Sequence, residues 1–146
     1  MAKTYLSLGS NSLNKIDVIH ESLNQIQQSE CIINKTSSIY ESEPWGYYSE
    51  NIFLNLVIEV ITDLKPIDLL QTIQKIENQF GRIRVGKNFQ DRTLDIDLLF
   101  YDNLIMFEKE LIIPHILMHK RKFCLIPMCE LSDKFVHPIY NKDMSQ

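Results

Sequence analysis

Residues 92–100 read Arg92-Thr-Leu-Asp-Ile-Asp-Leu-Leu-Phe100, in which Asp95 and Asp97 alternate with apolar residues and a short apolar run follows. This period of two predicts a β-strand. On a strand, Asp95 and Asp97 share one face with their Cα atoms roughly 6–7 Å apart, while the intervening apolar residues occupy the other. Two neighbouring carboxylates repel each other, and a hard divalent cation would compensate their charge.

Arginines surround this strand. Two lie upstream in Gly81-Arg-Ile-Arg84, and Arg92 comes just before the aspartates. Guanidinium groups are fixed donors that suit phosphate, and Mg²⁺ prefers one or two carboxylates together with waters and substrate phosphates. The combination predicts an enzyme that handles a nucleoside polyphosphate with magnesium. The alternative is a solvated face of an edge strand beside a hydrophilic loop, with the arginines as surface charges.

Residues 81–88 nearly spell a Walker A loop, with Asn88 where Ser or Thr would bind magnesium. That motif requires a strand before it and a helix after it, whereas here a helix is expected before it and a strand after it. The better interpretation of Gly81 and Gly86 is a loop that closes over substrate.

His115 and His119 are four residues apart, as in a metal pair on a helix. A zinc site is not expected, because no Glu follows His115 and Pro114 disfavours a helix that starts earlier. His115 could instead donate to phosphate beside Arg121, and a structural histidine is an equally good interpretation.

Hydrophobic periodicity along the rest of the chain predicts the order β-α-β-β-α-β, which is the ferredoxin-like α+β arrangement. The predicted strands before the aspartate strand are 4–8, 32–40 and 52–61, and the predicted helices are 13–26 and 66–80. An extra C-terminal elaboration is expected, with a hairpin at 104–113 and short helices within 116–131 that are broken by Pro127. Residues 1–146 are expected to form a single domain.

The composition is that of a soluble globular protein, with 45% hydrophobic and 23% charged residues. A formal net charge of −4 argues against general nucleic-acid binding, while basic clusters at 82–92 and 119–122 suit a small anionic ligand. Three cysteines without CxxC spacing indicate reduced thiols and a cytoplasmic location. The sequence contains no signal-peptide core and no apolar stretch of membrane-spanning length.

Several aromatic residues lie in or near the predicted loops, and filling the core is the default interpretation for each of them. They are Trp45, Tyr47, Tyr48, Phe53, Phe89 and Phe123. A flat heterocyclic ligand would need two such rings to sandwich it and an amide such as Asn55 to contact its polar edge. The sequence permits this arrangement.

Six motifs, taken in order, resemble the 6-hydroxymethyl-7,8-dihydropterin pyrophosphokinase family of folate biosynthesis. They are Leu6-Ser-Leu-Gly-Ser-Asn11, Tyr40-Glu-Ser-Glu-Pro44, Phe53-Leu-Asn55, Gly81-Arg-Ile-Arg84, Arg92-Thr-Leu-Asp-Ile-Asp97 and Ile113-Pro-His115. The resemblance runs along nearly the whole chain, and the fifth motif is highly specific. It implies a ferredoxin-like core with three mobile catalytic loops. It also implies transfer of pyrophosphate from ATP to the pterin's hydroxymethyl group, giving the pterin diphosphate and AMP.

The resemblance also implies roles for individual residues. Asp95 and Asp97 would bind two Mg²⁺ ions that bridge the ATP phosphates and the attacking hydroxyl. Arg82 and Arg92 would stabilise charge on the transferring group. The residues implied for ATP binding are Gln74, Glu77, Arg84, His115 and Arg121. The residues implied for pterin binding are Ser42, Phe53, Asn55 and Phe123.

The chain is therefore expected to be a monofunctional, ATP- and Mg²⁺-dependent pyrophosphokinase that acts as a monomer. Its expected partners are ATP and the pterin, with no nucleic acid and no membrane. The alternative is a catalytically silent ferredoxin-like sensor that binds a nucleotide in the same cleft. A sensor has no need of paired strand carboxylates beside arginines, so this feature discriminates between the two hypotheses.

Overall fold

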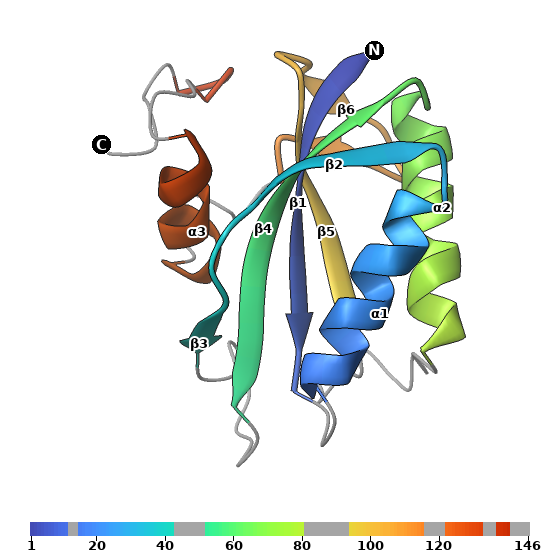
Figure 1. Cartoon of the computed structure of the whole chain (residues 1–146). Coiled ribbons are helices and arrows are strands. Elements are labelled where there is room, and N and C mark those ends of the chain that lie inside the picture. The colour runs from blue at the N-terminus through green and yellow to red at the C-terminus, as the bar shows by residue number, and fades with distance from the viewer. Residues whose placement is uncertain (12–14, 43–51, 81–93, 116–121, 133–136, 141–146) are drawn as a thin grey trace.

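The computed structural model describes residues 1–11, 15–42, 52–80, 94–115, 122–132 and 137–140. The elements in chain order are β1 (Ala2–Ser10), α1 (Lys15–Gln27), β2 (Cys31–Thr36), β3 (Tyr40–Ser42), β4 (Phe53–Thr62), α2 (Pro66–Gln79), β5 (Asp95–Tyr101), β6 (Met106–Phe107), β7 (Ile112–Ile113) and α3 (Lys122–Ser132) (Figure 1). The predicted β-α-β-β-α-β order is confirmed, with the second predicted strand divided into β2 and β3.

The main sheet is antiparallel and has the strand order β2-β4-β1-β5, with β3 also paired to β4. This is the strand order of a ferredoxin-like sheet. The central strand β1 pairs with β4 along its whole length and with β5 on its other side. Among the described strands, β5 forms one edge of the sheet, so the strand with the two aspartates has an open side.

Ser37 divides the strand that was predicted at 32–40. Its backbone N–H donates to the Val57 carbonyl at 2.9 Å, and its Oγ accepts from the Val57 N–H at 2.9 Å. A side chain thus replaces a backbone carbonyl for one step of the ladder. Pairing with β4 resumes at Tyr40, which lies opposite Asn55.

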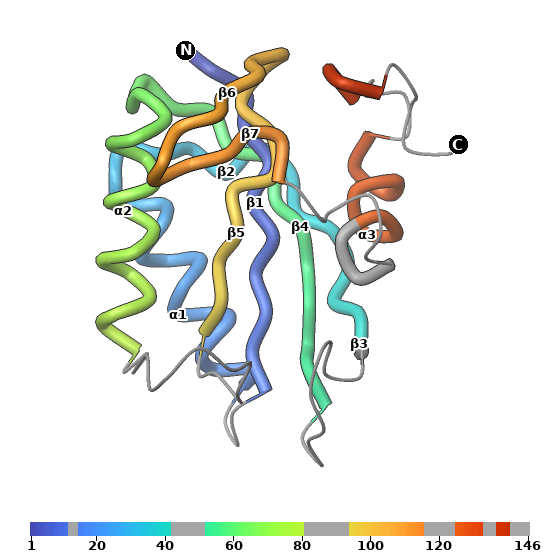
Figure 2. The backbone as a smooth tube through the Cα atoms, turned by 180° about the vertical axis from the view of Figure 1, so that it is seen from behind, coloured from blue at the N-terminus to red at the C-terminus, as the bar shows by residue number. Residues whose placement is uncertain are grey.

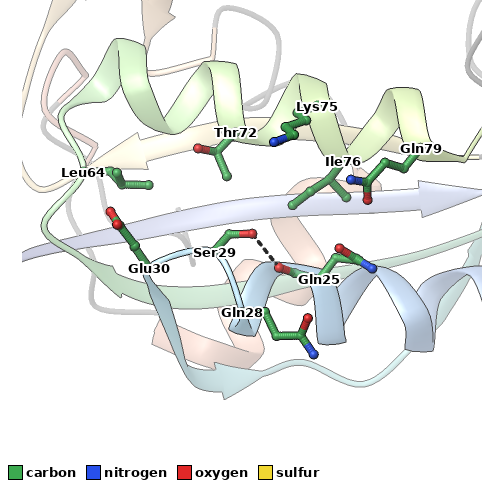
Figure 3. A pocket seen from close by; sticks show the side chains of 9 residues that line it. All are labelled: Gln25, Gln28, Ser29, Glu30, Leu64, Thr72, Lys75, Ile76 and Gln79. Carbon is green, nitrogen blue, oxygen red and sulfur yellow. Dashed lines mark hydrogen bonds between the residues drawn. The ribbon is translucent and has the colours of Figure 1, made fainter.

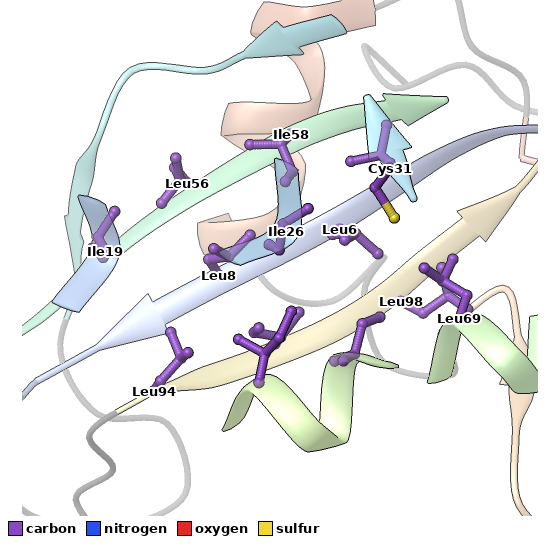
Figure 4. Packing of buried hydrophobic residues seen from close by; sticks show 14 of the residues in the cluster. Leu6, Leu8, Ile19, Ile26, Cys31, Leu56, Ile58, Leu69, Leu94 and Leu98 are labelled. Carbon is purple, nitrogen blue, oxygen red and sulfur yellow. The ribbon is translucent and has the colours of Figure 1, made fainter. Parts of the chain in front are cut away.

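Helices α1 and α2 cover one face of the sheet, and α3 lies on the other (Figures 1 and 2). The larger core is between the sheet and the first two helices, where the apolar sides of β1, β4 and β5 meet the apolar stripes of α1 and α2. Figure 4 shows this packing, and its labelled residues are Leu6, Leu8, Ile19, Ile26, Cys31, Leu56, Ile58, Leu69, Leu94 and Leu98. The apolar residues that alternate with the aspartates, Leu94, Ile96 and Leu98, therefore lie in this core, as the sequence predicts.

The C-terminal elaboration partly differs from the prediction. The hairpin is confirmed, since β6 pairs with β7. The prediction of short helices broken by Pro127 is wrong, because α3 runs through that proline as one helix. Pro127 removes one backbone donor, but the next residue, Met128, is fully buried against Tyr5, Val57 and Phe100 of the sheet, and this packing stabilises the helix across the missing bond. None of the described helices is long and apolar enough to cross a membrane.

A buried carboxylate lies on the α3 face of the sheet. Glu59 on β4 is 1% exposed, and its oxygens accept hydrogen bonds from the Tyr5 hydroxyl and the Asn34 amide, each at 2.7 Å. Burial alone would raise the pKa of Glu59, but the two hydrogen bonds and the charges of Lys3 and Lys35 lower it below its ordinary value. Glu59 therefore stabilises the fold in its ionised form.

This lowered pKa makes the contribution of Glu59 to stability dependent on pH. The contribution is present above the unfolded pKa of about 4.3 and is lost as the pH falls through the lower folded pKa. We expect Glu59→Gln to lower the free energy of unfolding by about 1–3 kcal/mol at pH 7, and by much less near pH 3. Urea unfolding at the two pH values measures this difference. Glu110→Gln, at an exposed position, is the control, and an equal loss at both pH values would contradict a role for the charge.

Candidate active site

Asp95 and Asp97 lie on the face of β5 that turns away from α1 and α2. Both side chains are partly exposed, whereas Ile96 between them is buried in the larger core. On the neighbouring strand, Gly9 pairs with Asp95 and Ser7 pairs with Asp97. The predicted pair of carboxylates on one face of a strand is therefore present, next to small residues of β1.

A row of paired residues crosses the sheet at Gly9. This glycine pairs with Asp95 on one side and with Asn55 of β4 on the other. Since neighbouring strands are about 4.8 Å apart, Asn55 and Asp95 are separated by roughly 10 Å. A Cβ atom at Gly9 would lie 3.0 Å from Asn55 Oδ1 and 3.7 Å from Phe53 Cδ1. The glycine thus leaves room for the buried Asn55 amide beside β1.

Sequence reasoning did not identify Gly9 as a site residue. Its place at the end of the predicted first strand, between Leu8 and Ser10, was the available signal. A glycine inside a strand often marks a close approach by another group. The group in this case, the Asn55 amide, is 46 residues away in the chain, so the sequence alone does not name it.

His115 is brought beside the aspartates by the segment that follows β7. The Ile113–Pro114 peptide is cis, and the backbone N–H of His115 donates to the Leu99 carbonyl of β5 at 3.1 Å. The Nε2 atom of His115 is then 3.8 Å from Asp97 Oδ1. A protonated imidazole at this position would attract both Asp97 and an anionic phosphate.

Glu77 of α2 lies on the other side of β5. It is 3% exposed, and its Oε2 accepts a hydrogen bond from the backbone N–H of Ile96 at 2.9 Å. Because β5 is an edge strand among those described, no described strand pairs with this N–H, and the buried carboxylate satisfies it. Glu77 therefore holds the backbone at the residue between the two aspartates. Gln74, one turn earlier on α2, is exposed.

Several predicted site residues lie outside the described part of the chain. Arg82, Arg84, Arg92 and Arg121 are among them, as are the loop glycines Gly81 and Gly86. Ser42 and Phe123 belong to β3 and α3, but their side chains are not described. The structure does place α2 before residues 81–93 and β5 after them, which is the reverse of the Walker A context, as predicted.

The described residues that could hold a metal ion are Asp95 and Asp97. In the part of the chain that the structure describes, no group of three or more His, Cys, Asp and Glu side chains is arranged around a common point. Magnesium needs only one or two protein carboxylates when waters and substrate phosphates supply its other ligands. The two hard oxygen donors therefore fit Mg²⁺ bound together with a phosphate substrate.

A groove of about 490 Å³ lies elsewhere, in the layer of helices (Figure 3). It is lined by Gln25, Gln28, Ser29, Glu30, Leu64, Thr72, Lys75, Ile76 and Gln79. None of the predicted site residues lines it, and its residues come from the helix side of the sheet. The groove is therefore separate from the aspartate site.

Comparison with known proteins identifies the family. The sequence profile of the 7,8-dihydro-6-hydroxymethylpterin-pyrophosphokinase (HPPK) family matches residues 5–133. The chain belongs to this family. The resemblance carried by the sequence motifs is thereby confirmed, and the chain is an HPPK enzyme, a diphosphotransferase of folate biosynthesis.

The chain matches relatives of similar length and also part of a much longer relative. The 2-amino-4-hydroxy-6-hydroxymethyldihydropteridine pyrophosphokinase of Haemophilus influenzae is 38% identical over 139 residues, which cover 94% of this chain and 86% of the relative. The protein of the same name from Aquifex aeolicus is 36% identical over 146 residues, covering 100% of this chain and 90% of the relative. The folic acid synthesis protein FOL1 of Dictyostelium discoideum is 41% identical over 134 residues, but they cover 92% of this chain and only 20% of that longer protein.

Solved structures confirm the HPPK fold. The crystal structure of wild-type Plasmodium falciparum HPPK-DHPS with pteroate matches 99% of this chain and 41% of that chain, with a TM-score of 0.78 and 16% identity. A crystal structure of HPPK-DHPS in complex with substrates matches 99% of this chain and 42% of that chain, with a TM-score of 0.79 and 14% identity. At this level of identity the similarity concerns the fold alone.

The bond between Glu77 and Ile96 predicts a cost for removing the carboxylate. We expect Glu77→Ala to lower the free energy of unfolding by about 2–3 kcal/mol, because a buried backbone N–H loses its acceptor. Glu77→Gln keeps an acceptor oxygen and should lose less. Thermal unfolding measures both, with Asn78→Ala as a control at the neighbouring exposed position. Equal stability of Glu77→Ala and Asn78→Ala would show that the bond does not stabilise β5.

Proposed function

We propose that this HPPK enzyme transfers pyrophosphate from ATP to the hydroxymethyl oxygen of 6-hydroxymethyl-7,8-dihydropterin. The oxygen attacks the β-phosphorus, its bond to that phosphorus forms as the α,β-bridging bond breaks, and AMP leaves. The hydroxyl proton is released, and the pterin diphosphate is the other product. The observation that carries the proposal is the pair of aspartates on the open face of β5, with His115 3.8 Å from Asp97, in a chain of this family.

Asp95 and Asp97 are proposed to hold two Mg²⁺ ions together with the phosphates of ATP. The ions would neutralise phosphate charge and help to orient the attacking and leaving oxygens. The chain's own contribution is to keep the two carboxylates on one face, which β1 pairing and the bond between Glu77 and Ile96 both support. His115 is proposed to donate to a phosphate oxygen from its position beside Asp97.

The remaining nucleotide contacts are proposed from the family resemblance. Arg82 and Arg92 would stabilise charge on the transferring group, because phosphoryl transfer depends mainly on positioning and electrostatic neutralisation. The residues proposed for ATP binding are Gln74, Glu77, Arg84, His115 and Arg121. Since Glu77 is buried against the backbone of β5, we propose that it supports the nucleotide site through that strand.

The pterin is proposed to bind across β1 from the aspartates. Asn55 would contact its polar edge, with Ser42, and Phe53 and Phe123 would stack on its faces. Two pairings support this assignment, since Ser42 lies opposite Phe53 in the ladder and Asn55 lies in the row with Gly9 and Asp95. The hydroxymethyl group would then point along the row toward the phosphates.

We also propose that residues 1–146 form a single pyrophosphokinase domain that acts as a cytoplasmic monomer without nucleic-acid or membrane partners. The coverage of the two bacterial relatives, 86% and 90% of their lengths, supports the single domain. Cys31 and Cys129 are thiols rather than half-cystines, which is compatible with a reducing compartment.

The direct test is to incubate the protein with ATP, Mg²⁺ and 6-hydroxymethyl-7,8-dihydropterin and to separate the nucleotides. Pterin-dependent AMP supports the proposal. Formation of ADP would indicate transfer of a single phosphate and would contradict it. Tight ATP binding without either product would favour the silent sensor.

The metal assignment predicts the effect of replacing one aspartate. We expect Asp97→Ala and the isosteric Asp97→Asn to lower kcat by at least about 10³-fold while leaving the fold intact, because transition-state charge loses its compensation. Turnover assays over a Mg²⁺ titration, with circular dichroism, measure the effect. Asp63→Asn, which is exposed at the far end of the sheet, is the control. Near-normal turnover in a folded Asp97 variant would contradict the metal site.

The close approach at Gly9 predicts a separate effect on the pterin. In Gly9→Ala the new methyl group would lie 3.0 Å from Asn55 Oδ1, so the amide must shift. We expect the KM for pterin to rise on the order of tenfold, with a smaller change in the KM for ATP. Steady-state kinetics with each substrate varied in turn measure this difference. An unchanged KM for pterin would contradict the placement of Asn55 at the pterin edge.

A further inference from the structure

Glu130 joins α3 to the segment that leads into β3. Its Oε2 accepts hydrogen bonds from the Ser38 backbone N–H at 2.8 Å and from Ser38 Oγ at 3.1 Å. Its Oε1 accepts a short hydrogen bond from the Tyr40 hydroxyl. The three residues, Glu130, Ser38 and Tyr40, are called the Glu130 brace below. Both oxygens of one carboxylate are thus used to connect positions about 90 residues apart in the chain.

The brace is exposed, which limits what it contributes to overall stability. Hydrogen bonds at such positions are exchanged for bonds to water, so they add little to the free energy of unfolding. The hydrogen bonds from Tyr40 and from the Ser38 backbone lower the pKa of Glu130, and the same contact with Glu130 raises the pKa of Tyr40. Glu130 therefore stays ionised near neutral pH, and three donors remain directed at a full negative charge.

The two elements joined by the brace are the ones proposed to bind the pterin. On one side, Tyr40 lies opposite Asn55 in the ladder, and Ser42 lies opposite Phe53. On the other side, Phe123 belongs to α3, which contacts the sheet through the small apolar cluster around Met128. The apolar cluster provides non-directional packing, whereas the brace adds directional bonds at fixed distances.

We propose that Glu130 is a positioning residue for the pterin, fixing α3 relative to the β3–β4 ladder. This inference rests on the proposed pterin site. A flat ring held between two aromatic side chains needs both of them at van der Waals distance, and a gap of 0.5–1 Å forfeits about a quarter to a half of each contact. A small movement of α3 away from β3 therefore weakens pterin binding without disrupting the fold.

The aspartate pair of the proposed nucleotide side is not bonded to the brace. Asp95 and Asp97 lie on β5, which is held by β1, Glu77 and the segment that carries His115. No bond of the brace reaches these elements. Loss of the brace should therefore raise the KM for pterin much more than the KM for ATP. A general structural defect would affect both.

The test compares the wild type with Glu130→Ala, Tyr40→Phe and the double variant. Each is assayed for kcat and for both KM values, and the affinity for pterin is measured by fluorescence titration with a non-hydrolysable ATP analogue and Mg²⁺. We expect Glu130→Ala to raise the KM and the Kd for pterin about tenfold, with the KM for ATP changed less than twofold. Tyr40→Phe should give a smaller rise, and the double variant should be no worse than Glu130→Ala, because Glu130→Ala already removes the bond that Tyr40→Phe removes. Glu110→Ala is the matched control at an exposed carboxylate.

Three outcomes would overturn the inference. They are an unchanged KM for pterin in Glu130→Ala, a parallel rise of both KM values, and additive effects in the double variant. Tyr40→Phe removes a single hydroxyl group, so it gives the answer even if Glu130→Ala does not fold. Wild-type protein that neither forms AMP nor binds pterin would instead refute the proposed function, and this measurement comes first, so the two failures are distinguishable.

Discussion

The hydrogen bond from the Ile96 N–H to Glu77 is the interaction on which the candidate site depends. Within the described sheet β5 is an edge strand, so its outward backbone groups need partners that do not belong to another described strand. Glu77 supplies one partner from α2, and the His115 N–H supplies another at the Leu99 carbonyl. The same two contacts that complete the backbone of the edge strand also fix the position of the aspartates and bring an imidazole beside them. Exposed edge strands promote aggregation in other proteins, whereas this edge strand carries the residues of the candidate site.

The alternation of residues within β5 explains why one face of this strand can hold two aspartates. On one face of the strand, Ile96 and its apolar neighbours are buried under α1 and α2. A shift of the register by one residue would place both aspartates in that core. The free energy of hydrophobic burial therefore holds the carboxylates on the opposite face despite their mutual repulsion. Glu59 lies on the same face as the aspartates but is buried. Its charge is compensated by two hydrogen-bond donors, Tyr5 and Asn34.

The sequence predicts those features that depend on local periodicity. The order of strands and helices, the shared face of Asp95 and Asp97 and the hairpin after β5 follow from apolar spacing and turn residues, and the specific motifs led to the family. Three features depend on partners far away in the chain and were not predicted. Ser37 divides a strand because its hydroxyl meets Val57, and α3 continues through Pro127 because Met128 is buried in the sheet. Gly9 matters because Asn55 comes within 3.0 Å of its missing side chain. In each case the residue itself is evident in the sequence, but the distant residue that it contacts is determined by the tertiary fold.

The site can be understood as two halves that meet at β1. The proposed phosphate half is built from β5, α2 and the segment after β7, whereas the proposed pterin half is built from β3, β4 and α3. They share the row in which Gly9 lies between Asn55 and Asp95. Transfer between two substrates requires the attacking oxygen and the phosphorus to be aligned to within a fraction of an ångström, and errors from the two halves add. A central strand with no side chain at Gly9 keeps that common reference fixed, and in the proposed arrangement each half is positioned by its own carboxylate, Glu77 on one side and Glu130 on the other.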